Sequence, residues 1–114
     1  MSKIEKVPFQ NGSTCRGDNY VVSDGSMDMA RIRIDGRYPE DPKQWALNKV
    51  SRGIAHVVIG VATLHLKDEP RILVSANETV EIPPNTHYAW SGHFDMVTTW
   101  SPPFNLEQYE VKEG

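Results

Sequence analysis

Eight glycines and eight prolines interrupt this chain of 114 residues every few positions. Apolar residues seldom recur at the three- and four-residue spacing that gives a helix one apolar face, so a helical fold is not predicted. Short runs rich in β-branched and aromatic residues occur instead, separated by turn signals such as Asp24-Gly25, Pro83-Pro84-Asn85 and Ser91-Gly92. These runs span residues 20–22, 29–34, 54–59, 61–66, 71–74, 79–82, 88–90 and 94–100. About eight strands at this spacing predict an all-β sandwich or barrel.

The order of apolar residues indicates which faces of the strands are buried. In residues 31–34 (Arg-Ile-Arg-Ile) the isoleucines share one face and the arginines the other, as a period of two requires. Residues 54–66 are apolar on both faces around Gly60. This pattern predicts a hairpin that is buried on both sides, or once in the core and once in a contact between subunits. We therefore expect a homodimer.

The chain is long enough for one modest core but not for a second independent one. We expect a single domain with its barrel over residues 29–108. Residues 1–28 are predicted to form an N-terminal arm or an added strand. The charged residues 106–114 are predicted to form a short helical turn or a frayed end, with 109–114 as the tail beyond the barrel.

Composition excludes several classes of protein. The formal net charge is −3, and a mildly acidic chain lacks the basic face that nucleic-acid phosphates need. The longest uncharged apolar stretch, residues 54–66, is shorter than the roughly 20 residues of a membrane-spanning helix. No export signal is visible, and the lone Cys15 fits a reducing compartment. We therefore expect a cytoplasmic protein that binds neither nucleic acid nor membrane.

Two blocks of sequence resemble the conserved motifs of the cupins. A strand that ends in residues 81–84 (Glu-Ile-Pro-Pro), followed by a tight turn and the aromatic residues Tyr88 and Trp90, resembles the second cupin motif. Residues 54–64 are similar to the strand, glycine turn and strand that close the first motif, and the resemblance covers about residues 29–108. It implies a small jelly-roll barrel, the double-stranded β-helix, which hosts enzymes as well as binding proteins.

Metal-binding cupins hold iron, manganese, zinc or nickel with three histidines and one glutamate that project into the barrel. In this sequence the two first-motif histidine positions fall on Ala46 and Asn48, the glutamate position on Gly53, and the second-motif histidine position on Tyr88. A register shifted by one residue would place His87 at the last position, but one histidine does not make a site. The resemblance therefore implies neither a metal nor another cofactor.

The four histidines are a second potential set of metal ligands. His56 and His65 would approach each other across the expected hairpin, and His87 and His93 flank residues 88–90. In this register the first pair lies outside the barrel, so we expect structural or subunit-contact roles for these side chains.

The barrel interior is predicted to be rich in aromatic and polar groups. Asn48, Tyr88 and Trp90 are expected in the lumen, with Tyr38 and either Trp45 or Trp100 near the mouth and Glu107 on a lid above it. Apolar walls with a few hydrogen-bonding groups are typical of small-molecule pockets. The alternative is that these rings merely fill a narrow barrel.

We therefore predict a cupin barrel that binds a small molecule, such as a sugar or an organic acid, without metal chemistry. An alternative is an isomerase, epimerase or lyase that uses Tyr88 and Glu107 as an acid and base pair, or a non-standard metal site. A third interpretation makes the barrel chiefly an assembly unit that pairs through the apolar residues 54–66.

Overall fold

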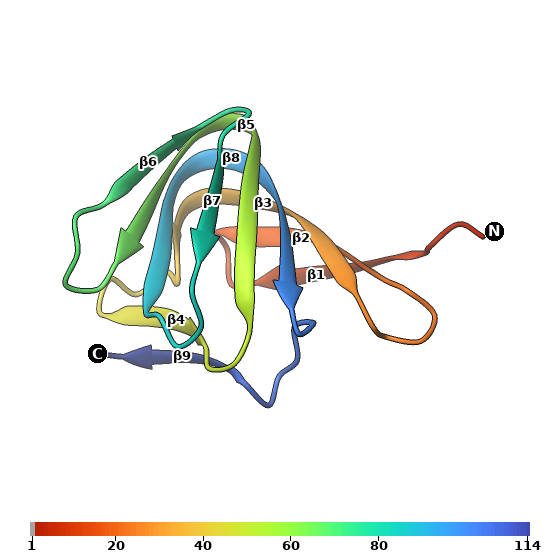
Figure 1. Cartoon of the computed structure of the whole chain (residues 1–114). Helices are drawn as coiled ribbons and strands as arrows, with labels where there is room; N and C mark the ends of the chain where they lie inside the picture. Colours follow the sequence, from red (N-terminus) through yellow and green to blue (C-terminus); the bar gives the residue numbers. More distant parts are fainter. Residues whose placement is uncertain (1) are drawn as a thin grey trace.

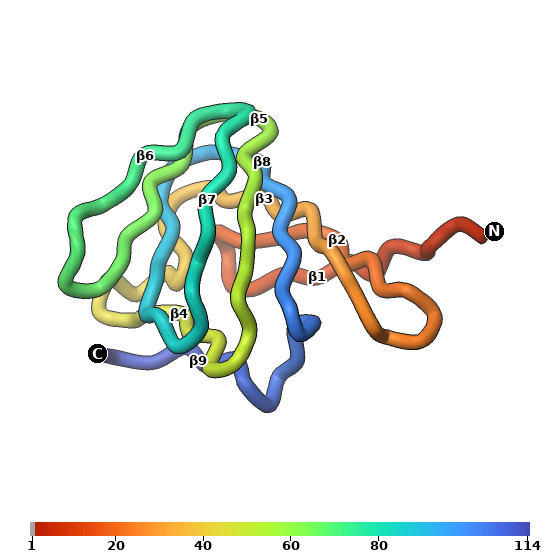
Figure 2. Tube along the Cα trace, viewed as in Figure 1, coloured from red at the N-terminus to blue at the C-terminus, as the bar shows by residue number. Residues whose placement is uncertain are grey.

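The computed structural model describes residues 2–114 and contains nine strands and no helix in that range. In chain order the strands are β1 (Lys6–Asn11), β2 (Cys15–Val21), β3 (Asp28–Tyr38), β4 (Gln44–Asn48), β5 (Arg52–Leu66), β6 (Ile72–Ser75), β7 (Thr79–Ile82), β8 (Tyr88–Ser101) and β9 (Tyr109–Glu113). They curl around a common interior, while the N-terminal segment and the β2–β3 connection extend away from it (Figures 1 and 2). The all-β prediction is confirmed. Nothing in residues 2–114 forms a helix able to cross a membrane.

β8 is the central strand of the barrel. Along one edge it pairs antiparallel with β3 from Ala30 to Tyr38, and along the other it pairs with β5 over nearly the whole length of both strands. β1 and β2 extend the sheet beyond β3, while β6 and β7 pair with the two halves of β5. β4 pairs with β9 and meets β8 at the single position Ala46↔Tyr88, so these two short strands cross one end of the barrel (Figure 1).

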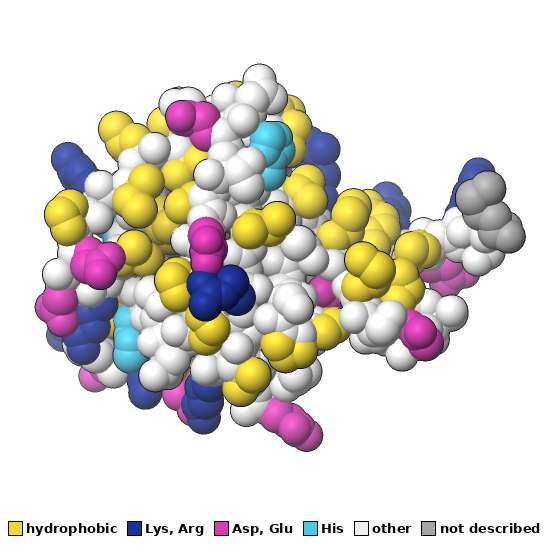
Figure 3. Space-filling view, viewed as in Figure 1, with side chains coloured by type: hydrophobic (Ala, Val, Ile, Leu, Met, Phe, Trp, Pro, Cys, Tyr) yellow, Lys and Arg dark blue, Asp and Glu magenta, His cyan; other side chains and the backbone are white. Residues whose placement is uncertain are grey.

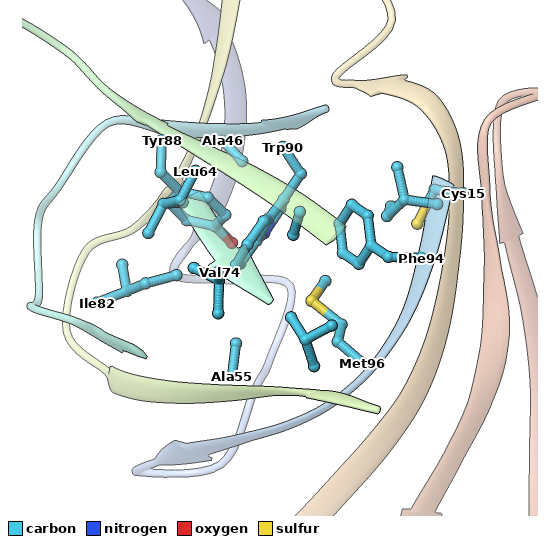
Figure 4. Packing of buried hydrophobic residues seen from close by; sticks show 13 residues of the cluster. Cys15, Ala46, Ala55, Leu64, Val74, Ile82, Tyr88, Trp90, Phe94 and Met96 are labelled. Atoms are coloured by element: carbon cyan, nitrogen blue, oxygen red, sulfur yellow. The ribbon is translucent and has the colours of Figure 1, made fainter. Parts of the chain in front are cut away.

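Alternate residues of β8 build the hydrophobic core. Tyr88, Trp90, Phe94 and Met96 are buried on the same face of the strand, as the two-residue period requires. Figure 4 shows these side chains turned toward one another inside the curled strands. The rings of Trp90 and Phe94 pack with their centroids 5.5 Å apart. Burial of these large aromatic groups is a main source of apolar stabilisation for the barrel.

β3 shows the alternation that its sequence predicts. Ile32 and Ile34 face the interior, and Ile34 is fully buried. Arg31 and Arg33 lie on the outside, where each forms a salt bridge of 3.0 Å with Asp95 of the neighbouring strand. The predicted division into an apolar and a basic face is confirmed.

β5 is one continuous strand, so the hairpin predicted around Gly60 is wrong. Gly60 has a φ of 88°, and a Cβ atom on it would collide with the carbonyl oxygen of His93. Glycine is the residue that fits this close approach of β5 to β8, which lies beside an irregularity in register between Val57 and Ile59. The glycine marks a bend in the strand and not a turn.

Gly92 has the same role in β8. Its φ is 126°, and the strand continues through it, so the turn predicted at Ser91-Gly92 is also wrong. The two strands predicted over residues 88–90 and 94–100 are therefore a single strand. This long strand, β8, pairs with β3 along one edge and with β5 along the other.

Both ends of the described chain belong to the sheet. β1 and β2 form an antiparallel pair that continues onto β3, so this part of the chain takes the added-strand form of the prediction and Cys15 begins a strand. Residues 106–108 form a turn, but residues 109–113 form β9 against β4, so the predicted helical turn or frayed end is wrong for these last residues. β4 was not predicted, because residues 44–48 (Gln-Trp-Ala-Leu-Asn) contain no β-branched residue.

Candidate functional site

A cavity of about 370 Å³ lies inside the barrel. Its size falls at the lower end of the range of small-molecule sites. The wall is mostly aromatic and aliphatic, with uncharged polar side chains from Asn11, Asn19, Asn48 and Thr98. Among residues 2–114, no Asp, Glu, Lys, Arg or His lines it.

The strands that build the core also build the cavity wall. Every lining residue of β3 and β8 has an even number, because a single face of each strand points inward. These residues are Ala30, Ile32, Ile34 and Tyr38 on β3, and Tyr88, Trp90, Met96, Thr98 and Trp100 on β8. Phe104 and Leu106, from the segment that follows β8, are 37% and 80% exposed and form the rim.

Asn48 and Tyr88 form the most buried polar pair of the cavity. Their side chains are held on β4 and β8, and the residues are 2% and 6% exposed. The Asn48 amide Nδ2 donates a hydrogen bond of 3.3 Å to the Tyr88 hydroxyl. The Asn48 Oδ1 atom is buried and has no hydrogen-bond partner among residues 2–114. Burial of an unpaired acceptor is unfavourable, so this atom is suited to receive a hydrogen bond from a bound molecule.

A second pair of hydroxyls faces the cavity from Tyr38 and Tyr109, which hydrogen-bond to each other. Burial raises the pKa of all three phenols, Tyr38, Tyr88 and Tyr109, above the ordinary value. Each phenol is therefore neutral at physiological pH. A neutral hydroxyl both donates and accepts hydrogen bonds, so these groups offer polar contacts without charge.

Cys15 also lines the cavity and is 4% exposed. Burial raises the pKa of its thiol to about 11, while a hydrogen bond with the Asn11 side chain acts in the opposite direction. The thiol is therefore protonated at neutral pH. A protonated thiol is a weak nucleophile, so the Cys15 side chain acts as a small apolar group in the cavity wall.

No protein-family model matches the chain, and no curated protein matches its sequence. Among solved structures it is similar to Pac13 of Streptomyces, a nucleoside dehydratase, with 23% identity over 99% of this chain and 92% of that one, and a TM-score of 0.83. Pac13 structures with uridine carry a tyrosine-to-phenylalanine or a histidine-to-glutamine substitution.

Two further structures are less similar. An ectoine synthase from P. lautus has 9% identity over 90% of this chain and 79% of that one, with a TM-score of 0.69. A cupin-like protein from Thermotoga maritima has 12% identity over 100% of this chain and 89% of that one, with a TM-score of 0.64. The fold is that of a small cupin. At these identities the structural similarity establishes the cupin fold. The chemistry of the site has to be inferred from its own residues, because one fold hosts many functions.

The positions that hold metal in other cupins do not fit a metal here. Tyr88 and Asn48 hydrogen-bond to each other, and Ala46 is a fully buried methyl group. At Gly53 an added Cβ atom would overlap the indole ring of Trp100, so no side chain at that position has room to reach the cavity. The cupin barrel therefore has an aromatic ring and an amide where a metal site would need imidazole and carboxylate.

None of the four histidines lines the cavity, and three of them contact separate partners elsewhere on the barrel. His56 contacts the Thr79 hydroxyl at 2.7 Å, His65 contacts the Ser91 hydroxyl at 2.7 Å, and His93 lies 3.1 Å from the Asp35 carboxylate. Because β5 is continuous, His56 pairs with β8 near Val97 and His65 near Ala89, so the predicted approach of these two histidines is wrong. Within the described chain, no group of three potential metal ligands is close enough to hold an ion.

Glu107 is exposed and does not line the cavity. The Asn105 side chain accepts hydrogen bonds from the backbone of Glu107 and Gln108, and this turn directs Gln108 inward instead. Gln108 is 5% exposed and is bonded to Ser51. The structure therefore does not bring together the acid and base pair that the sequence suggested from Tyr88 and Glu107.

Five of the six predicted site residues line the same cavity: Tyr38, Asn48, Tyr88, Trp90 and Trp100. Of the two tryptophans considered for the mouth, Trp100 lines it and Trp45 does not. Sequence reasoning missed Phe9, Asn19 and Tyr109, which reach the cavity through strands at the two ends of the chain. Alternation within β1, β2 and β9 does not show which side of each strand faces the cavity, because that depends on the strands with which they pair.

Proposed function

We propose that this cupin barrel binds a small uncharged molecule, a neutral sugar or a nucleoside, without the help of a metal. The observation that carries the proposal is the uncharged lining of the cavity, in which aromatic walls surround a few neutral polar groups. Aromatic rings stack on the flat or apolar faces of such ligands, while amides and phenols bond their polar atoms.

The lining favours a neutral ligand over an organic acid. A carboxylate that leaves water for a cavity without a cationic partner loses its hydration and gains no compensating charge. Charged groups of the barrel wall such as Arg31 and Arg33 face outward and are already paired with Asp95. Of the two ligand classes that the sequence suggested, the cavity therefore supports the sugar and not the acid.

The structure of Pac13 with uridine adds support for a nucleoside. Pac13 and this chain are similar over nearly their full lengths, and uridine is uncharged at neutral pH.

A thermal-shift panel of neutral sugars, nucleosides and organic acids tests the proposal. A ligand present at 100 times its dissociation constant adds about 2.7 kcal/mol to the free energy of unfolding. We expect at least one neutral compound to raise the Tm and the organic acids to leave it unchanged. Stabilisation by carboxylates alone would contradict the proposal.

Two neighbouring variants on β3 provide a matched pair. Ala30 lines the cavity, so Ala30→Phe should fill it and abolish the ligand-induced shift. Met29 is 45% exposed on the opposite face of the same strand, so Met29→Phe should leave the shift intact. Circular dichroism of both variants establishes that the fold is retained.

We further propose that the protein is a cytoplasmic homodimer. The lone, buried Cys15 is consistent with a reducing compartment. Apolar side chains are exposed along β5 and β6, including Ile54, Ile59, Val61 and Leu73. Figure 3 shows hydrophobic side chains at several places on the face drawn there. Such a surface favours association with a second copy. Light scattering that finds a monomer at micromolar concentration would contradict this assignment.

A further inference from the structure

The buried end of the cavity presents one hydrogen-bond acceptor beside one donor. Asn48 Nδ2 donates a hydrogen bond to the Tyr88 hydroxyl oxygen, while Asn48 Oδ1 is an unpaired acceptor. The Tyr88 hydroxyl thereby receives a hydrogen bond, and its own hydrogen has no acceptor among residues 2–114. The two free positions belong to groups 3.3 Å apart that line the same cavity.

We infer that this pair recognises a lactam edge, the adjacent N–H and C=O of a planar ring, and that Asn48 and Tyr88 determine ligand specificity. The ligand N–H would donate to Asn48 Oδ1, and the ligand carbonyl would accept from the Tyr88 hydroxyl. This inference rests on the proposed function and specifies the chemical class of its ligand.

The surrounding wall supports a planar ring with one polar edge. Tyr88 and Trp100 lie stacked with ring centroids 6.0 Å apart, and Trp90, Ile82 and Met96 complete the apolar surroundings. A hexose placed there would leave most of its hydroxyls without partners, and each unpaired hydroxyl costs free energy. A lactam ring satisfies both free groups with one edge and covers the apolar wall with its faces.

The remaining polar groups of the cavity suit a hydroxylated substituent on that ring. Asn19 on β2 is half-buried and Asn11 at the end of β1 is exposed, so both lie where the cavity is more open than at Asn48. Asn48, Tyr88 and Thr98 are thus the buried polar side chains of the cavity, and Asn11 and Asn19 form a more open set. A flat base at the buried pair with a sugar toward the open set matches this division.

Uridine, 5-methyluridine and 3-methyluridine are the test ligands, measured by titration calorimetry with the full chain. The two methyl derivatives have the same size, but only 3-methyluridine lacks the lactam N–H. Loss of a hydrogen bond to a buried acceptor weakens binding by about ten- to hundredfold. We expect this loss for 3-methyluridine and binding within about threefold of uridine for 5-methyluridine.

Two variants separate hydrogen bonding from steric exclusion. Asn48→Leu keeps the branching at Cγ and the number of side-chain heavy atoms but removes the acceptor, so uridine and 3-methyluridine should bind it with nearly equal affinity. A preference that survives in this variant would be steric and would overturn the inference. Tyr88→Phe keeps the ring, so it should weaken uridine binding about tenfold and retain the preference for uridine over 3-methyluridine.

The outcomes distinguish the inference from the function on which it rests. If 3-methyluridine binds the unmodified protein as tightly as uridine does, the lactam inference is wrong and binding of neutral molecules stands. If no uncharged compound of the panel binds, the proposed function fails together with it. The comparison of the three ligands needs no variant, so a variant that does not fold leaves the test intact.

Discussion

The indole ring of Trp100 lies over the α-carbon of Gly53, in the space that any side chain at that position would need. Gly53 and Trp100 are paired across β5 and β8, and Trp100 lines the cavity. The absence of a side chain on one strand is therefore what allows an aromatic wall on the other.

Gly53→Ala should destabilise the barrel and disturb the cavity together. The added methyl must displace the indole, and such overpacking costs about 1–3 kcal/mol. Chemical denaturation should find this loss, and ligand-induced stabilisation should decrease because the Trp100 wall moves. In a Trp100→Leu background the same substitution should cost much less, since the space is then free. Equal costs in the two backgrounds would show that these residues are not coupled.

Substitution of Gln108 should destabilise the barrel, whereas substitution of its neighbour Glu107 should not. Gln108 Oε1 accepts hydrogen bonds of 2.9 and 2.8 Å from the backbone amides of Val50 and Ser51, and its Nε2 donates to the Ser51 hydroxyl. Gln108→Ala leaves these buried groups unpaired and should lower the free energy of unfolding by about 2–4 kcal/mol.

Glu107→Ala serves as the control for that experiment. The Glu107 side chain is exposed, so its removal should change the free energy of unfolding by less than about 0.5 kcal/mol. The same variant should leave binding of the panel compounds unchanged. A loss of binding in Glu107→Ala would restore a role for this carboxylate at the cavity mouth.

Alkaline pH should destabilise the protein through Cys15. Burial raises the pKa of this thiol from its usual value of 9.0 to about 11. Between these values the unfolded chain has lost the thiol proton and the folded chain has kept it, so stability falls as pH rises. The contribution of the Cys15 thiol to the free energy of unfolding is full below pH 9 and declines by about 2–3 kcal/mol by pH 11.

The comparison of Cys15→Ala with the unmodified protein isolates this contribution. The variant should show a shallower decline in unfolding free energy between pH 9 and pH 11. Part of the decline should remain, because burial also raises the pKa of Tyr38, Tyr88 and Tyr109. Identical slopes for the two proteins would mean that the thiol ionises in the folded state as it does in water.

Chelation should affect neither stability nor binding. The cupin ligand positions carry Ala46, Asn48, Gly53 and Tyr88, none of which offers the imidazole or carboxylate of a metal site. Dialysis against EDTA should leave the Tm and the ligand-induced shift unchanged. A decrease in Tm that zinc or iron restores would contradict this expectation.

Local patterns predicted the centre of the fold well. Two-residue alternation assigned the buried faces of residues 31–34, and the spacing after Pro83 and Pro84 brought Tyr88 and Trp90 into the cavity. These predictions succeeded because the direction of a side chain on a strand follows from its position alone. The loss of the cupin metal ligands was also visible in the sequence, because the four ligand positions carry other residue types.

Features that depend on distant pairing could not be predicted. Gly60 is an ordinary turn signal in the sequence, and only its approach to His93 turns it into a bend within a strand. Tyr109 reaches Tyr38 across 71 positions of the chain, and no local pattern reports that contact. Glu107 was predicted at the mouth as a lid carboxylate, but the Asn105 turn places the neighbouring Gln108 inward instead.

The inward face of β8 carries core and cavity residues in one alternating series. A substitution at Tyr88, Trp90 or Met96 therefore changes both the ligand that fits and the stability of the barrel that holds it. Phe104 and Leu106 are free of this constraint because they stand on the exposed rim. New ligand preferences, whether they arise in evolution or in a laboratory library, should accumulate first on the rim.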